Sequence, residues 1–343
     1  MIGNRFLVTI VSLAMVLVFA GSGGAAQQYT LKISHIEATG GAADTTYLYL
    51  KKILEEKSGG RIKVILYTGK SMAQSDTEQG EIVRQNVVQL VPLPTHTLSS
   101  MANIPQFSVF EFPYVFEDLQ EIYKLLDSDL AKSWTKILED EVGVVVYEGF
   151  VRGWLSLGTK KAINTPSDLK GLKIRTMATD MQMALISALG ASPTIIAYGE
   201  LYTAQQQGTV DGILTVTQLY DTDRFAEVID NLSVIRATAH FLLPTVNKKW
   251  LDSLPEDLRA IFDECMKEYI AYGRDYEAKL DKKVLEEMPA KYNVKVRQYT
   301  DEELAPFKAA VKKVWDDNYD RPGKGVMDEV LKFLGKDREE LFK

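Results

Sequence analysis

The sequence contains a single cysteine, Cys265, and only three histidines, His35, His96 and His240, among its 343 residues. One cysteine cannot form an intrachain disulfide, and so few histidines leave almost no basis for a structural zinc site of the Cys/His type. Basic residues are also in deficit, because 40 Lys and Arg face 47 Asp and Glu, for a formal net charge of −7. The chain therefore has no basic excess with which to bind nucleic acid or an anionic lipid surface.

Motifs that carry common enzyme chemistry are also missing. The sequence contains no Gly-x-Gly-x-x-Gly for a dinucleotide and no Gly-x-Ser-x-Gly for a nucleophilic serine. Gly69-Lys70-Ser71 looks like the end of a phosphate-binding loop, but Val64 stands where that loop must begin with glycine. Cys265 falls on the apolar face of a predicted helix, which favours a packed core residue over a nucleophile. We expect no catalytic residue, no metal and no cofactor.

Acidic residues are absent from the N-terminal segment. Arg5 precedes an apolar run over residues 6–19, and small residues then extend to Ala26. This pattern predicts a secretory signal peptide that is cleaved near Ala26. A membrane anchor is the alternative, but the run is shorter than the ~20 residues that a bilayer requires. Export without disulfides fits a bacterial periplasm, and the only cysteine is too far along the chain for a lipoprotein.

The rest of the sequence has the composition of a globular protein, with 46% hydrophobic and 25% charged residues. Strand-like residues 29–35, a helical pattern over 43–58 and a strand-like run over 62–67 give the order strand, helix, strand. That order favours a mostly parallel sheet with helices on its faces, the α/β class. A second alternating set begins at 142–147 and continues to 212–217.

The later elements indicate how these two α/β units are joined. Predicted strands over 228–235 and 240–247 carry the chain past the second unit. From Pro255 to Met288 an apolar face continues with only one glycine, and a helix of that length would reach ~50 Å, longer than one domain is wide. We therefore expect two lobes joined by crossover strands and a long helix that spans both. The predicted division places residues 27–150 and 241–280 in lobe I and residues 151–240 and 281–343 in lobe II.

Arg175 is the binding residue that the local pattern singles out. A turn that contains Gly171 leads into the strand 172–174, so Arg175 emerges at the carboxyl end of that strand. Ligands of open α/β sheets bind at this edge. A guanidinium is always charged and forked, so an arginine that faces a closed cleft pairs with a carboxylate through two hydrogen bonds. A surface arginine in an ordinary ion pair is the alternative.

Several segments resemble the periplasmic solute-binding subunits of tripartite ATP-independent periplasmic (TRAP) transporters, the dicarboxylate-binding-protein-like (DctP) family. The specific pair is INTPSDLKGLKIR, which ends at Arg175, and YGELYTAQQQGTVDG, which contains Asp211. With weaker matches these segments span nearly the whole mature chain in order. The weaker matches are residues 58–64, 112–116, 190–194 and 254–258.

The resemblance implies a two-lobed, type II-like periplasmic binding protein that closes over a small acid like a hinge. It also implies that Arg175 pairs with the ligand carboxylate, that Tyr198 supplies a ring, and that Thr215 takes the place of a ligand-binding asparagine. In sialic-acid binders a second arginine would fall near Leu155 and an acidic residue near His96. Both are absent here, which argues against a polyhydroxylated sugar acid.

These substitutions shift the inferred cleft toward apolar character. Trp154 and Leu155 would lie beside Arg175, with Tyr198 opposite and Phe241 at the rim. An apolar or aromatic monocarboxylate then fits better than a C4 diacid, because each unpaired polar ligand group costs ~1–3 kcal/mol when buried. Trp154 is equally consistent with the core of a lobe.

Three polar residues remain open candidates. His96 follows a proline-rich break and is either a pocket donor or a loop histidine that bonds to the backbone. His35, at the end of the first strand, is a similar candidate. Arg152 is either a second pocket cation or a member of an ion pair.

The sequence therefore predicts a protein, not an enzyme, that acts as a monomer in the periplasm and binds a small organic acid. Its expected partners are the membrane subunits of a TRAP transporter. A C4-dicarboxylate or a sugar acid is the alternative ligand, and reading the ligand for a membrane sensor is the alternative role.

Overall fold

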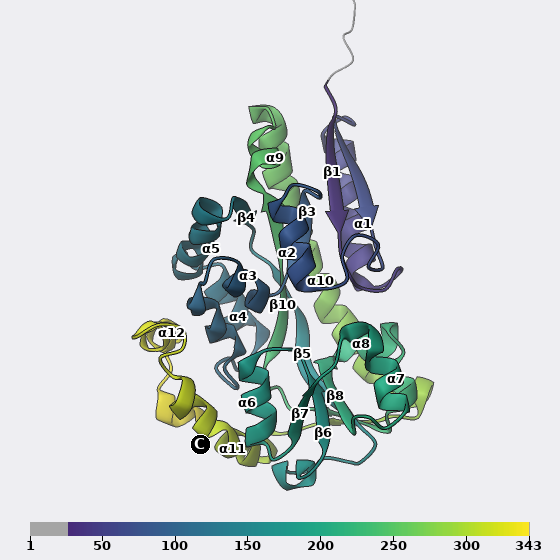
Figure 1. The fold of residues 1–343 in the computed structure, drawn as a ribbon, viewed down its shortest axis with the longest axis vertical. Helices are drawn as coiled ribbons and strands as arrows, with labels where there is room; N and C mark the ends of the chain where they lie inside the picture. Colours follow the sequence, from purple (N-terminus) through teal and green to yellow (C-terminus); the bar gives the residue numbers. More distant parts are fainter. Residues whose placement is uncertain (1–26, 343) are drawn as a thin grey trace, which may run out of the picture.

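The structure is a computed structural model that describes residues 27–342 (Figure 1). The predicted signal peptide and its cleavage site near Ala26 lie outside the described residues. One mixed sheet runs through the molecule in the strand order β2-β1-β3-β10-β5-β8-β6-β7, and helices cover its faces. The predicted α/β class and the two-lobed architecture are confirmed.

The first strand, helix and strand form the predicted parallel unit. In β2, Ile62 and Val64 are buried whereas Lys63 and Ile65 are exposed, the period of two that one covered sheet face requires. The third strand begins at Leu90, after Asn86 turns the chain at φ 59°. The elements are β1 (Tyr29–Ser34), α1 (Ala42–Lys57), β2 (Ile62–Tyr67), α2 (Asp76–Arg84) and β3 (Leu90–Leu93).

Residues 95–141 form helices that the sequence patterns above did not predict. The strand β3 continues through Pro92, and Pro94 then caps the next helix. Ser128 accepts a hydrogen bond from the backbone of Ala131 and so begins α5 in the ordinary way for a helix N-cap. The elements are α3 (Thr95–Met101), the 3₁₀ turn η1 (Pro105–Glu111), α4 (Leu119–Leu126) and α5 (Asp129–Glu141).

Two long strands, β5 (Phe150–Thr159) and β10 (Ala239–Asn247), connect the upper and lower parts of the sheet and pair with each other. Their register shifts between His240, which faces Gly153, and Phe241, which faces Val151. Arg152 is therefore the extra residue of a β-bulge, and Gly153 has a φ of 124°. The short strand β4 (Val144–Val146) pairs with the far end of β10.

The lower unit repeats the alternation of strands and helices, as predicted. Parallel pairing of β6 with β7 and with β8 brings the carboxyl ends of these strands to one edge of the sheet. The elements are η2 (Pro166–Leu169), β6 (Lys173–Thr176), α6 (Asp180–Ala188), β7 (Ser192–Ile195), η3 (Tyr198–Glu200), α7 (Leu201–Gln206), β8 (Gly212–Val216), α8 (Thr217–Thr222), η4 (Phe225–Val228) and β9 (Asn231–Val234).

The long helix is α10 (Glu256–Tyr292), which follows the short α9 (Lys248–Asp252). Its 37 residues correspond to ~55 Å, and it packs against α1 of the upper part and against α8 and β11 of the lower part. Figure 1 shows it running behind the sheet along both parts. The expected helix that spans both lobes is therefore present.

The remaining elements divide between the two parts. The strand β11 (Lys295–Gln298) pairs with β9, and α11 (Asp301–Asn318) packs against α6. The helix α12 (Val326–Leu334) packs against α4, and η5 (Arg338–Phe342) packs against α11. The residue boundaries of the two lobes stay a prediction. Across residues 27–342, no helix combines the length and the apolar character that crossing a membrane requires.

Candidate ligand site

A cavity of about 110 Å³ lies between the upper and lower parts of the sheet. The carboxyl ends of β1, β6 and β8 contribute residues to it, as do the two long strands and the start of α2. Arg175, Tyr198, Thr215 and Leu155, four of the predicted site residues, line it together. The other lining residues are Ile36, Glu37, Asp76, Arg152, Met177, Val216, Leu219, His240 and Leu242.

Arg175 is the penultimate residue of β6 and is only 5% exposed. Its Nε donates a hydrogen bond of 3.2 Å to the backbone oxygen of Ile196, and within residues 27–342 no carboxylate pairs with its guanidinium. Burial therefore lowers its pKa to about 10. A buried cation without a counterion is stabilised by an anion that enters the cavity.

Arg152 is equally buried, at 2% exposed, but its charge is compensated. It forms an ion pair with Glu37, and its Nε lies 3.1 Å from the Oε1 atom of Glu277 on α10. Gln218 supports this pair by donating hydrogen bonds to the backbone oxygens of Arg152, at 2.7 Å, and Glu277, at 3.3 Å. Although burial acts to lower the pKa of Arg152, the two carboxylates raise it above its usual value.

Glu277 is 1% exposed, and its pKa responds to two opposed effects. Burial raises the pKa of Glu277 to about 7, and the nearby Arg152 counteracts this rise without cancelling it. The pair formed by Arg152 and Glu277 is therefore a buried structural link between β5 and α10. Arg152 is a member of an ion pair, and it also lines the cavity.

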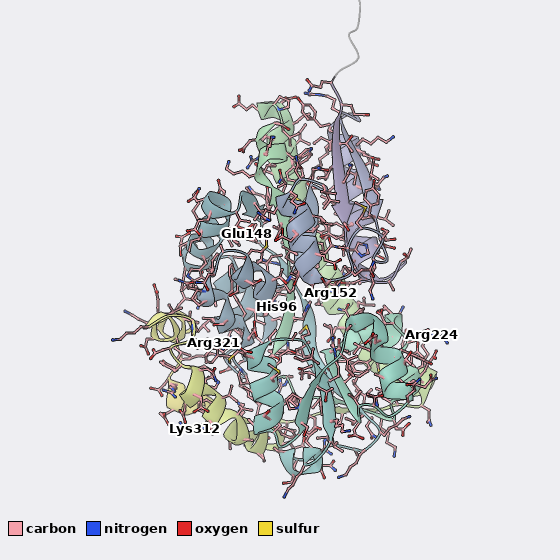
Figure 2. All side chains as sticks on the ribbon, viewed as in Figure 1. His96, Glu148, Arg152, Arg224, Lys312 and Arg321 are labelled. Carbon is pink, nitrogen blue, oxygen red and sulfur yellow. The ribbon has the colours of Figure 1, made fainter. Side chains whose placement is uncertain are left out.

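Three further titratable side chains lie in or near the cavity. Burial, followed by repulsion from Glu37, raises the pKa of Asp76 to about 7. Burial lowers the pKa of His240 to about 3 and that of His96 to about 4, so both imidazoles are neutral near pH 7. Figure 2 shows His96 and Arg152 close to the middle of the molecule, whereas Arg224 lies at its outer edge.

The remaining wall is largely apolar. Leu155 and Val216 come from the paired strands β5 and β8, and Leu242 comes from β10. Thr215 is the polar residue on β8, where it is 5% exposed. Apart from the charged groups, the cavity therefore offers hydrocarbon surface and a hydroxyl.

Tyr198 lines both this cavity and a second one of about 260 Å³. The Nζ atom of Lys70, which follows β2 in the upper part, lies 5.2 Å from the centre of the Tyr198 ring. This cation–π contact joins the two parts of the molecule at the mouth of the site.

The other four predicted site residues do not line the cavity. The Nε2 atom of His35 donates a hydrogen bond of 2.7 Å to the Oδ1 atom of Asp44, and the ring stacks on Tyr47. Phe241 packs 5.2 Å from the ring of Phe110 in the core. The half-buried Trp154 packs against the same core. His96 is close enough to His240 to help lower the pKa of His240, but it does not line the cavity.

The β-bulge explains why Trp154 and Leu155 differ. In a regular strand, Arg152 and residue 154 would share a face, because side chains alternate. The extra residue in β5 breaks this alternation, so Arg152 and Leu155 line the cavity instead. The same alternation on β10 places His240 and Leu242 in the cavity and Phe241 on the opposite side.

Sequence reasoning missed Glu37, Asp76 and His240. Glu37 follows β1 by three residues, so the rule that ligands bind at the carboxyl ends of parallel strands could have identified it. Asp76 follows the N-cap Ser75, and an acid in the first turn of a helix is common. The sequence therefore gave no reason to assign Asp76 to a binding site. Within the described chain, no group of three or more His, Cys, Asp or Glu side chains could hold a metal ion.

Comparison with known proteins identifies relatives over most of the chain. The sequence model of bacterial extracellular solute-binding protein family 7 matches residues 33–321. The C4-dicarboxylate-binding periplasmic protein DctP of Rhodobacter capsulatus is 26% identical over 298 residues, which cover 87% of this chain and 89% of that protein.

Solved structures share the fold. A TRAP periplasmic solute-binding protein from Ochrobactrum anthropi, with its C-terminus bound in the ligand-binding pocket, superposes with a TM-score of 0.81 and 27% identity over 92% of this chain and 99% of that chain. The sugar acid binding protein of Advenella mimigardefordensis, in complex with galactonate, gives a TM-score of 0.83 with 20% identity over 90% of this chain and 98% of that chain.

Proposed function

The chain belongs to bacterial extracellular solute-binding protein family 7, and from that premise we propose that it binds a small monocarboxylate with an apolar body. It does so in the periplasm and delivers the solute to the membrane subunits of a TRAP transporter. The family and fold are those of transport proteins that bind solutes, not of enzymes.

The observation that supports a carboxylate is the unpaired charge of Arg175. This guanidinium is 5% exposed, points to the cavity and has no acidic partner among the described residues. A ligand carboxylate would supply the missing counterion through two parallel hydrogen bonds. Arg175, Tyr198, Thr215 and Leu155 are the predicted residues that we retain as the ligand site.

The pairing of Arg152 argues for one carboxylate rather than two. Arg152 already balances Glu37 and Glu277, so among the described lining residues no second cation is free for a diacid. A sugar acid would bury several hydroxyl groups, and each one left unpaired costs ~1–3 kcal/mol. The apolar surface of Leu155, Val216 and Leu242 fits a hydrocarbon body instead.

The size of the cavity narrows the ligand further. Its volume of about 110 Å³ is below that of an engineered cavity of ~150 Å³ that binds benzene. Within the class of apolar monocarboxylates, short branched acids therefore fit this closed cleft better than phenyl or indole acids.

Mass spectrometry of the solute released when the purified mature protein is denatured would identify the ligand directly. A thermal-shift panel should then rank short branched monocarboxylates above succinate, malate and aldonates. A solute at ~100 times its Kd adds about 2.7 kcal/mol to the free energy of unfolding, which shifts the melting curve visibly. If only C4 diacids or aldonates are released or bind, the proposed ligand class is wrong.

Delivery to a transporter requires its own test. Vesicles that contain the two membrane subunits should take up the identified solute only when this protein is added. If uptake is absent but the liganded protein binds a membrane sensor, the role in transport is wrong and the sensor role replaces it.

A further inference from the structure

The cavity contains a second ionisable side chain without a charged partner, an acid where Arg175 is a base. Asp76 lines the same cavity from the first turn of α2 in the upper part of the molecule, whereas Arg175 lies at the end of β6 in the lower part. No hydrogen bond or ion pair joins the Asp76 carboxyl to any side chain within residues 27–342. The site therefore presents an acid and a base that face the ligand from opposite lobes.

We propose that Asp76 binds a cationic nitrogen of the ligand, so that the protein selects zwitterionic monocarboxylates, of which aliphatic amino acids are the simplest class. This inference rests on the proposed function, because it keeps Arg175 as the partner of the carboxylate. The ligand itself then completes a salt bridge between the two lobes.

The balance of charge around the cavity supports a zwitterion. Glu37, Asp76 and the adjacent Glu277 are three acids, whereas Arg152 and Arg175 are two bases. A purely anionic ligand would add another negative charge to a site that water leaves on closure, where unbalanced charge is costly. An ammonium group on the same ligand offsets the added carboxylate.

The N-terminus of α2 favours the charged form of Asp76, whereas burial and Glu37 oppose it. Asp76 follows the N-cap Ser75, and a negative charge in the first turn of a helix is stabilised by the helix dipole. His240 and His96, the other titratable groups on this side, are neutral and offer Asp76 no cation. Glu37 repels it, and Arg152 is committed to its own acids.

The competing possibility is that Asp76 is protonated and donates a hydrogen bond to a hydroxyl or oxo group of the ligand. Burial and Glu37 raise the pKa of Asp76 to about 7, so both forms are accessible near neutral pH. The two possibilities differ in whether the ligand brings a positive charge, and this difference can be measured.

The test compares two ligands that differ only at that group, L-valine and (S)-2-hydroxy-3-methylbutanoate. Titration calorimetry on the mature protein should show L-valine binding at least about tenfold more tightly. Asp76→Asn should reduce this preference to about twofold or less, and Arg175→Ala should abolish binding of both ligands. Asp129→Asn is the matched control, because Asp129 also follows a serine N-cap at the start of a helix but is exposed, so the preference should not change.

The pH dependence of the wild-type protein gives a second test that needs no variant. The zwitterion requires the ionised Asp76, so its affinity should rise as the pH increases from 6 to 8. The hydroxyl of the hydroxy acid can donate to the ionised carboxylate or accept from the protonated carboxyl, so the affinity of this ligand should change much less over the same range. Glu277 also has a pKa of about 7, and its titration should change the affinities for both ligands alike. The difference between the two plots of affinity against pH therefore reports the group that contacts the ammonium.

The outcomes separate this inference from the proposed function. If hydroxy or oxo acids bind as tightly as the amino acid, or if Asp76→Asn leaves the preference unchanged, the role of Asp76 is overturned and the proposed function stands. If neither kind of monocarboxylate binds, and Arg175→Ala does not weaken binding of the solute released from the protein, both are overturned.

Discussion

Arg152 on β5 and Arg175 on β6 are the two arginines that line one cavity, and their surroundings differ in a single respect. Both are nearly inaccessible to solvent, at 2% and 5% exposed. Arg152 has two carboxylate partners, Glu37 and Glu277, whereas Arg175 has only a backbone oxygen.

This difference teaches how to separate a structural arginine from a binding one. A buried cation that is already balanced holds neighbouring elements together, and removing it leaves its acids unpaired. A buried cation that is not balanced destabilises the empty protein and is compensated when the ligand arrives. Arg152 and Arg175 are alike in burial, in residue type and in lining the cavity. They differ in whether a carboxylate pairs with the guanidinium.

The largest expected effect is the loss of affinity when Arg175 is removed. Arg175→Ala should weaken ligand binding by roughly 3–5 kcal/mol, because the ligand carboxylate is then buried without a partner. Arg175→Lys should recover only part of this loss, since the forked geometry is missing. In the absence of ligand, the free energy of unfolding should not fall. Titration calorimetry and urea unfolding measure the two quantities, with Arg224→Ala as an exposed control.

The opposite profile is expected for Arg152. Arg152→Ala should lower the free energy of unfolding of the empty protein by about 3 kcal/mol, the lower end of the range for breaking a buried ion pair, since Glu277 can take up a proton. Urea unfolding at pH 7 measures this change. If Arg152→Ala and Arg175→Ala lower the stability equally, the distinction between the two arginines is lost.

The pH dependence of stability tests the structural role of the pair between Arg152 and Glu277. Burial raises the pKa of Glu277 from its usual range to about 7. Between about pH 4.3 and 7 the unfolded chain has released this proton while the folded protein retains it, so the stability that Glu277 contributes falls as the pH rises. Glu277→Gln cannot titrate, so the stability advantage of the wild type over this variant should decrease by about 3 kcal/mol across this window. Glu287→Gln, an exposed acid of the same helix, should follow the wild-type curve.

The smallest effect concerns the mouth of the site. Lys70 contacts the ring of Tyr198 across the two lobes, and an exposed cation–π contact contributes about 0.5–1 kcal/mol. Lys70→Ala should therefore weaken ligand binding by roughly two- to fivefold, mainly through faster dissociation, and Lys70→Arg should retain the affinity. Stopped-flow kinetics measures the dissociation rate, and an unchanged rate in Lys70→Ala would show that the contact does not hold the lobes closed.

Much of the fold could be predicted from local patterns. The strand β2 matches its predicted bounds, and the helices α1 and α10 lie within a few residues of theirs, because apolar periodicity and end signals are local properties of the chain. The segment 95–141 was not assigned, although α5 buries Ala131, Trp134 and Leu138 at helical spacing, a local pattern that could have identified this helix. Arg175 could also be placed, because the end of a strand is a position that the sequence pattern defines.

The α/β class, the long helix, the lack of an intrachain disulfide and the position of Arg175 near a strand end all follow from local patterns in the sequence. Which side chains share the cavity with Arg175 depends on the folded arrangement. Because of a one-residue bulge in β5, Leu155 rather than Trp154 lines the cavity. The register of β10 against β5 places His240 rather than Phe241 in it. Glu277 meets Arg152 from a helix 125 residues further along the chain. Such contacts depend on strand register and on the packing of distant elements, and local spacing along the chain does not encode them.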